Sequence, residues 1–238
     1  MKKIFIPIIT IINIFCFSSC EKITGEGPVE TEERAYNNFS GLYAAIPGTI
    51  YYTKSNNFKV QLKAQRNILD IIKTSVRGNE LKLDYRSNTI VGKHNTIEIH
   101  VSAPSLESLH LDCSGTVRVT GNIISQNLHS QVSSSGSLII DSVQITDVLR
   151  ATVSGSGKIN ILSGQTASEN ITISGSGNAN VSAVKALNTI ARINGSGYTK
   201  VYPIQTLNAF ISGSGDIYYL GNPIISSHIS GSGKILKL

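Results

Sequence analysis

Residues 152–161 read TVSGSGKINI, residues 172–181 read TISGSGNANV and residues 192–201 read RINGSGYTKV, and these aligned stretches decide the fold. In each of them, apolar residues occupy alternate positions on both sides of a Ser-Gly centre. The same centre occurs seven times at intervals of 18 to 21 residues, and its glycines are Gly115, Gly136, Gly157, Gly177, Gly197, Gly215 and Gly233. A repeat of this length is typical of a solenoid, in which one repeat forms one coil and stacked coils share a core.

The arrangement within one repeat predicts a parallel coil. Alternation of apolar residues indicates strands with one buried face, and a glycine-rich centre indicates a bend, because glycine reaches positive φ at low cost. We therefore expect strand, Ser-Gly corner, strand and return loop in each coil. An antiparallel meander, sandwich or barrel would place the glycines at hairpin turns instead. The predicted fold class is all-β, with a parallel β-helix or β-solenoid over residues 105–238.

Residues 35–104 are predicted to form a second β-rich part with one short helix. Three segments alternate with a period of two, namely residues 58–62, 81–85 and 97–101. Residues 67–76 instead space their apolar side chains as a helix does, behind a candidate N-cap at Asn67. The sequence leaves open whether this part stacks as further coils.

The N-terminus predicts export and lipid anchoring. Residues 1–19 combine a basic start with an apolar stretch that is too interrupted for a membrane span, as in a signal peptide. The stretch ends in Phe-Ser-Ser before Cys20, which resembles the lipobox of bacterial lipoproteins, where the cysteine is acylated. An ordinary secretory cleavage site is the alternative. Residues 20–34 are acidic and contain glycine and proline, so we expect a flexible tether.

Charge and cysteine content narrow the function classes. The net charge of +6 and a mildly basic body are compatible with anionic glycans or lipid headgroups, or with ordinary solvated lysines. No basic stripe is interleaved with stacking aromatics, so nucleic-acid binding is not expected. If Cys16 leaves with the signal and Cys20 is acylated, Cys113 stands alone and no intramolecular disulfide forms.

The Ser-Gly rows are expected to be architectural, with hydroxyls satisfying backbone groups or the serine of the next coil at a tight corner. A calcium-binding repeat needs an aspartate after each glycine, and only Asp216 fits. No catalytic, metal-binding or cofactor-binding motif is present. A polysaccharide lyase or hydrolase is the alternative, but the acidic residues it would use fall in different coil phases: Asp112, Asp141, Asp147, Glu169 and Asp216.

Functional residues are expected on the variable, outward positions after each corner. Amide, amine and aromatic side chains gather there in successive coils, at Asn160, Asn178, Asn180, Tyr198, Lys200 and Tyr218. Such groups on a flat sheet are typical of a glycan-binding or protein-binding face. An ordinary solvated strand surface is the alternative.

Several segments together resemble a known family. These are Phe39-Ser-Gly-Leu42, Asn79-Glu-Leu-Lys-Leu83, Ile97-Glu-Ile-His-Val-Ser-Ala-Pro104 and the repeated Ser-Gly-Ser-Gly. They resemble the putative auto-transporter adhesin head domain, or GIN domain. The resemblance implies a β-helical lipoprotein of the Bacteroidetes cell envelope, expected at the outer membrane, and supplies no active-site residues. The predicted role is non-enzymatic adhesion, ligand binding or scaffolding on a membrane held through Cys20.

Overall fold

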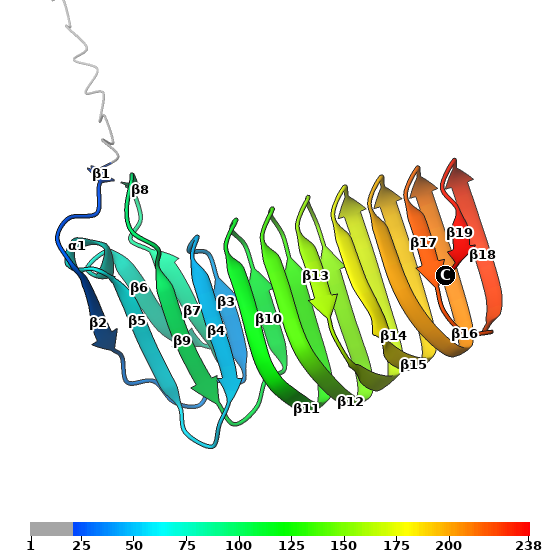
Figure 1. The fold of residues 1–238 in the computed structure, drawn as a ribbon, viewed down its shortest axis with the longest axis horizontal. Coiled ribbons are helices and arrows are strands. Elements are labelled where there is room, and N and C mark those ends of the chain that lie inside the picture. The colour runs from blue at the N-terminus through cyan, green and yellow to red at the C-terminus, as the bar shows by residue number, and fades with distance from the viewer. Residues whose placement is uncertain (1–20) are drawn as a thin grey trace, which may run out of the picture.

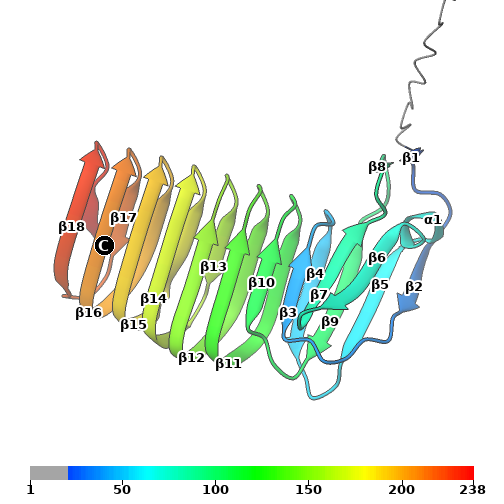
Figure 2. The same cartoon turned by 180° about the vertical axis from the view of Figure 1, so that it is seen from behind.

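The computed structural model describes residues 21–238, and Figures 1 and 2 show them as one column of stacked strands. The predicted signal peptide and the lipidation of Cys20 lie outside the described residues. The all-β solenoid with one short helix is confirmed, and that helix is α1 (Arg66–Leu69). Within residues 21–238, no helix is long and apolar enough to cross a membrane.

The C-terminal column consists of parallel coils. Its strands are β10 (Ser108–Leu111), β11 (Thr116–Val132), β12 (Ser137–Val153), β13 (Lys158–Ile161), β14 (Gly164–Gly175), β15 (Asn178–Gly195), β16 (Tyr198–Gly213), β17 (Asp216–Tyr219), β18 (Ile224–Gly231) and β19 (Ile235–Lys237). Every pairing among them is parallel, with Val117 beside Leu138 and Leu138 beside Ile159. The seven predicted corners therefore delimit six complete turns.

The predicted return loop is wrong for several coils. β11 and β12 are each 17 residues long and run from one corner to the next. Register shifts between Val119 and Asn122 and between Ser125 and Asn127 bend the strand without ending it. A bulge keeps most backbone groups in the ladder, so the chain turns at less cost than a loop would require.

The corners depend on glycine for two different reasons. In the last four corners the glycine two residues before the aligned one has positive φ, as in Gly175 (133°) and Gly195 (142°). The second glycine, on which the repeat was aligned, is needed for close approach: a Cβ on Gly177 would lie 2.5 Å from the carbonyl oxygen of Gly157. The backbone N–H of Gly177 donates to the Gly155 carbonyl at 2.8 Å, so successive corners stack backbone on backbone.

The serine hydroxyls take less part in the corners than the sequence suggested. Ser232 Oγ donates to Ser214 Oγ at 3.1 Å, which is the expected coil-to-coil contact. At Ser176, the backbone N–H instead bonds the Gly155 carbonyl at 3.2 Å, and the side chain is exposed. The corner is therefore held mainly by main-chain hydrogen bonds.

The N-terminal part continues the same column. β3 (Gly41–Ala44) and β4 (Thr49–Lys54) pair in parallel with β10 and β11, and Gly48 occupies the corner between them. β7 (Glu80–Tyr85) and β9 (Glu98–Ala103) form the next layer out. One apolar core runs through residues on both sides of the predicted boundary at residue 104, so the two parts form one continuous column.

Antiparallel strands close the N-terminal end, and we call these strands together with α1 the cap. β5 (Lys59–Gln65) pairs with β9, β2 (Val29–Glu33) pairs with β5, and β6 (Ile72–Arg77) pairs with β7. Near them, β1 (Glu21–Ile23) pairs with β8 (Thr89–Val91). The predicted flexible tether is thus wrong for residues 21–23 and 29–33, which are strands.

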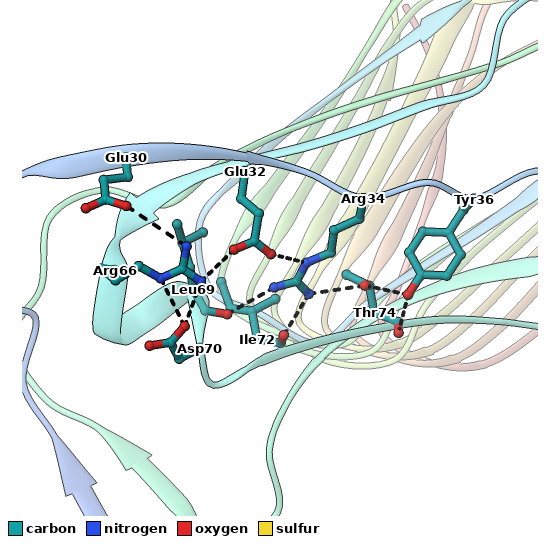
Figure 3. Close-up of polar contacts among 9 residues, drawn as sticks. All are labelled: Glu30, Glu32, Arg34, Tyr36, Arg66, Leu69, Asp70, Ile72 and Thr74. Atoms are coloured by element: carbon teal, nitrogen blue, oxygen red, sulfur yellow. Dashed lines mark hydrogen bonds and ion pairs between the residues drawn. The ribbon is translucent and has the colours of Figure 1, made fainter.

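Arginine side chains explain why this acidic segment is ordered (Figure 3). Arg34 donates to the carbonyls of Ile72 (2.7 Å) and Leu69 (3.0 Å) and to the Glu32 carboxylate (2.7 Å). Arg66 bonds the other oxygen of Glu32 at 2.6 Å. These charge-assisted bonds hold β2 and the residue after it against α1 and β6, and they neutralise the acidic charge of β2. They also lower the pKa of Glu32 against the opposing effect of its partial burial.

The helix is shorter than its apolar pattern predicted. It begins after Gln65 rather than Asn67, and residues 72–77 belong to β6. Asn67 does not cap: its amide donates to the Thr24 carbonyl at 2.7 Å and its oxygen accepts from the Glu26 N–H at 3.1 Å. Ile68, Leu69, Ile71 and Ile72 are still buried and Val76 is partly buried, because both the helical turn and β6 face the core.

One acidic side chain lies inside the core. Glu169 is fully buried in the row Leu149, Glu169, Thr189, Leu207. Its Oε2 accepts from Thr189 Oγ1 at 3.1 Å, while Oε1 has no partner in the described part of the chain. Burial raises its pKa to about 8, and the hydrogen bond from Thr189 only partly opposes this. The carboxyl is therefore protonated at neutral pH.

Substituting the corner glycine tests the close approach. We expect Gly177→Ala to lower the free energy of unfolding by about 1–3 kcal/mol, because the new methyl group meets backbone that has no room to move. Ser176→Ala in the same corner is the control and should change it by less than about 0.5 kcal/mol. Urea denaturation measures both, and equal stability of the two variants would refute the packing argument.

Substituting the buried acid tests its protonation. The unfolded chain releases this proton near pH 4.5 and the folded chain only near pH 8, so Glu169 should lower stability progressively as pH rises between these values. We expect Glu169→Leu to be more stable than the parent at pH 8 by roughly 3–5 kcal/mol, with the difference much smaller at pH 4. Chemical denaturation across this range measures the slope. The exposed Glu107→Gln should leave the slope unchanged, and a parent with no excess slope contradicts the assignment.

Candidate functional site

The six predicted surface residues lie together on the strands that follow the corners. Asn160 pairs with Asn180, Asn180 with Lys200, and Lys200 with Tyr218, so these four form one row across β13, β15, β16 and β17. Asn178 pairs with Tyr198 in the neighbouring row. The structure thus brings all six together. We call this surface the amide–aromatic face, defined by Asn160, Asn178, Asn180, Tyr198, Lys200 and Tyr218.

Alternation along each strand orients these side chains. Ile159, Ala179, Thr199 and Ile217 are fully buried, so the residues on either side of them point away from the core. The parallel ladder spaces equivalent positions of successive coils about 4.8 Å apart. The face is therefore a rigid array in which the backbone fixes the separation of the functional groups.

A lysine between two tyrosines is the main feature of the face. Lys200 Nζ lies 5.9 Å from the ring centroid of Tyr198 and 5.8 Å from that of Tyr218. The two rings are 6.1 Å apart at 87°, an edge-to-face geometry. Both distances from the ammonium are within the range of a cation–π interaction, so the amine and the rings restrict one another.

Hydrogen bonds orient two further groups on the face. Asn180 Oδ1 accepts from Ser182 Oγ at 2.8 Å, which fixes the plane of the carboxamide. The Tyr218 hydroxyl donates to Asp216 Oδ2 at 3.4 Å. Loss of hydration and the nearby Asp216 carboxylate raise the pKa of Tyr218, so its hydroxyl stays protonated at neutral pH.

The row that contains Asn160, Asn180, Lys200 and Tyr218 extends further along the column than the sequence indicated. His100 pairs with Tyr51, and Tyr51 with Arg118, at the same outward position of the N-terminal layers. The rings of Tyr51 and His100 stack with centroids 5.0 Å apart and 15° between planes. Sequence reasoning missed this pair because the N-terminal strands join the column out of sequence order. Alternation within residues 97–101 was the only available signal.

The acidic residues that an enzyme would need are dispersed. Glu169 is inside the core, and Asp112 Oδ2 accepts from the Tyr43 hydroxyl at 3.1 Å. Asp141 accepts from the Gly121 N–H, and Asp216 accepts from the Lys234 N–H on a different face from Asp112. Among residues 21–238, no group of three histidine, cysteine or acidic side chains is placed to hold a metal ion.

Cys113 and a pair of histidines make contacts within the column. Cys113 is a buried free thiol whose Sγ donates to the Ile46 carbonyl at 3.1 Å, and burial raises its pKa. His110 and His129 lie on different rows of successive coils, but their rings meet edge to face at 5.3 Å. Burial, followed by the charges of His110 and Arg150, lowers the pKa of His129.

Two hollows lie away from the amide–aromatic face. One of about 450 Å³ lies where the coils bend, lined by Ile145, Ala167, Leu187 and Ile204 and by five polar residues. Another, of about 500 Å³, lies at the C-terminal end of the column. The amide–aromatic face is thus presented as a sheet surface.

These features define a β-solenoid protein built of Ser-Gly coils on a capped N-terminal end. The chain belongs to the family described as putative auto-transporter adhesin, head GIN domain, whose model matches residues 38–223. The resemblance inferred from the sequence is therefore confirmed.

Solved structures share the fold. A putative adhesin from Bacteroides fragilis has a TM-score of 0.80 and 24% identity, with 91% of this chain and 100% of that chain covered. A putative adhesin and a putative lipid binding protein from Parabacteroides distasonis both have TM-scores of 0.74, at 16% and 23% identity, with 92% of this chain and 100% of theirs covered. No curated protein matches the chain.

Proposed function

We propose that this protein is a lipid-anchored, non-enzymatic adhesion or ligand-binding protein of the cell envelope. The observation that supports this proposal most directly is the amide–aromatic face, which places amide, amine and phenol groups in register on a rigid sheet. The family description and the solved putative adhesins agree with such a role. A glycan or a protein surface is the proposed partner.

The chemistry of the face suits a polar ligand with flat apolar patches. Asn160, Asn178 and Asn180 offer both donors and acceptors to hydroxyl or amide groups. Tyr198 adds an aromatic surface that is 38% exposed. Hydrogen bonding beside an aromatic platform gives orientation and contact area at low entropic cost, because a tyrosine has few rotatable bonds.

The anchor is proposed at Cys20, which directly precedes β1 in the sequence. β1 begins at Glu21 and pairs with β8, so the described chain enters at this end (Figure 1). Acyl chains at Cys20 would hold the capped end near the membrane, with the outer membrane as the proposed location. Stable anchoring by acyl chains takes more than one chain or signal, which lipoprotein acylation supplies.

Removing the face tests ligand binding. We expect Asn180→Ala, Tyr198→Ala and Lys200→Ala together to weaken binding to glycan arrays or native-membrane partners at least tenfold, since three contacts are lost. The control carries Asn170→Ala, Thr172→Ala and Arg192→Ala on the strands before the corners, and circular dichroism checks folding. Unchanged binding in the first variant would show that the face is not the site. Release of new reducing ends or unsaturated sugars from polysaccharides would favour the enzyme alternative instead.

Replacing the cysteine tests the anchor. Cys20→Ala should abolish incorporation of labelled palmitate and move the protein from the membrane fraction to the soluble fraction of its native cells. Cys113→Ala is the matched control, because its thiol is buried in the column and should leave labelling unchanged. Labelling that persists in Cys20→Ala contradicts the proposed site.

A further inference from the structure

The two ends of the column differ in how they are closed. At the N-terminal end, Ile68, Leu69, Ile71 and Ile72 are at most 3% exposed beneath the antiparallel cap. At the C-terminal end, within residues 21–238, β18 pairs only with β16 and β19 only with β17 (Figure 1). Each therefore presents a free backbone edge, which is a template for pairing with another strand.

The inward residues of the last coil are uncovered. Leu207, Ala209 and Ile211 of β16 are at most 2% exposed, whereas no strand among residues 21–238 lies over their neighbours in β18. These neighbours are Ile225, Ser227 and Ile229, and the two isoleucines are 39% and 42% exposed. With Tyr219, Ile235 and Leu236, they line the hollow of about 500 Å³.

The inward row of β18 is symmetric about its centre. Reading along the strand in either direction gives isoleucine, serine, isoleucine, with Ser227 in the middle. A second β18 laid antiparallel with its Ser227 opposite would place Ile225 of each copy against Ile229 of the other. Such a self-complementary patch is what a two-fold, isologous interface requires.

We propose that the C-terminal end binds a second copy of this chain, with β18 of each copy pairing antiparallel about a two-fold axis at Ser227. The inward isoleucines then become part of a continuous core, and the free backbone groups complete a ladder. β18 contains no lysine, arginine or carboxylate, so the β18 ladder itself places no fixed like charges opposite one another. Its one titratable side chain, His228, falls opposite Ser226 of the second copy.

The area is sufficient for a specific contact. Eight extended residues span about 26 Å. Two sheets and their side chains make the end roughly 20 Å thick, since packed sheets lie about 10 Å apart. Each copy therefore contributes on the order of 500 Å². The total of about 1,000 Å² reaches the lower limit for a specific interface, to which main-chain hydrogen bonds are added.

A head-to-tail stack is disfavoured by the cap. At the other end, β2 is exposed and pairs only with β5, and its carboxylates are already engaged: Glu30 and Glu32 with Arg66, and Glu33 with Lys59. They leave little charge to attract Lys234 and Lys237 at the C-terminal end. A two-fold contact also closes at two copies, whereas a head-to-tail contact would grow into a filament.

Cysteine cross-linking tests the two-fold axis. In the full chain held in detergent, Ser227→Cys should form a disulfide-linked dimer under mild oxidation, because opposite Cα atoms of an antiparallel pair lie about 4.5–5.5 Å apart. Ser230→Cys on the same strand is the matched control. It lies about 20 Å from its counterpart in this arrangement, so we expect at least tenfold less cross-linked product. Equal cross-linking of both variants, or none above the parent chain, overturns the axis.

Sedimentation equilibrium tests the association itself. At about 100 µM, which is well above a micromolar Kd, the parent chain should have the mass of two copies after correction for detergent. Ser227→Arg should be monomeric with an unchanged circular dichroism spectrum, because the whole of β18 is exposed in the single chain. A monomeric parent, a species larger than two copies, or a dimer that persists in Ser227→Arg each contradicts the proposal. Ligand binding by the amide–aromatic face is measured separately and does not depend on this result.

Discussion

The close stacking of backbone at the Ser-Gly corners is the constraint on which the rest of the structure depends. At Gly177 a side chain would collide with the Gly157 carbonyl, and the N–H of Gly177 bonds the Gly155 carbonyl at 2.8 Å. This contact fixes the register of one coil on the next. Because alternate residues face opposite sides of a strand, a slip of one residue would expose the entire apolar row. The corners thus determine which side chains form the core.

Because the register is fixed, the inward positions determine folding, and the outward positions are free to vary for recognition. Inward positions are apolar in nearly every coil, and the buried Glu169 is accommodated by protonation and a bond from Thr189. Outward positions carry no such requirement, so Asn180, Lys200 and Tyr218 follow one another without regularity of type. The ladder still fixes their spacing. Variable chemistry at constant spacing lets one backbone carry different binding faces.

A column of coils must also close its ends, because each coil buries its apolar row only against a neighbour. The N-terminal end does so with strands of opposite direction, held by Arg34 and Arg66 (Figure 3). The C-terminal end leaves Ile225 and Ile229 uncovered. Within residues 21–238, this asymmetry gives the column one end closed by antiparallel strands and one end, at β18 and β19, with free strand edges.

Local sequence by itself determined the Ser-Gly repeat, the parallel coil and the meeting of six residues on one face, because period and spacing encode these features directly. Tertiary structure alone decided that Gly48 sits beneath Gly115, that residues 80–103 lie outside residues 41–54, and that the acidic segment 29–33 is a strand. These pairings join residues far apart in sequence, and no local period records them. The hydrogen bonds from Arg34 and Arg66 to the Glu32 carboxylate likewise form only once β2 packs against α1.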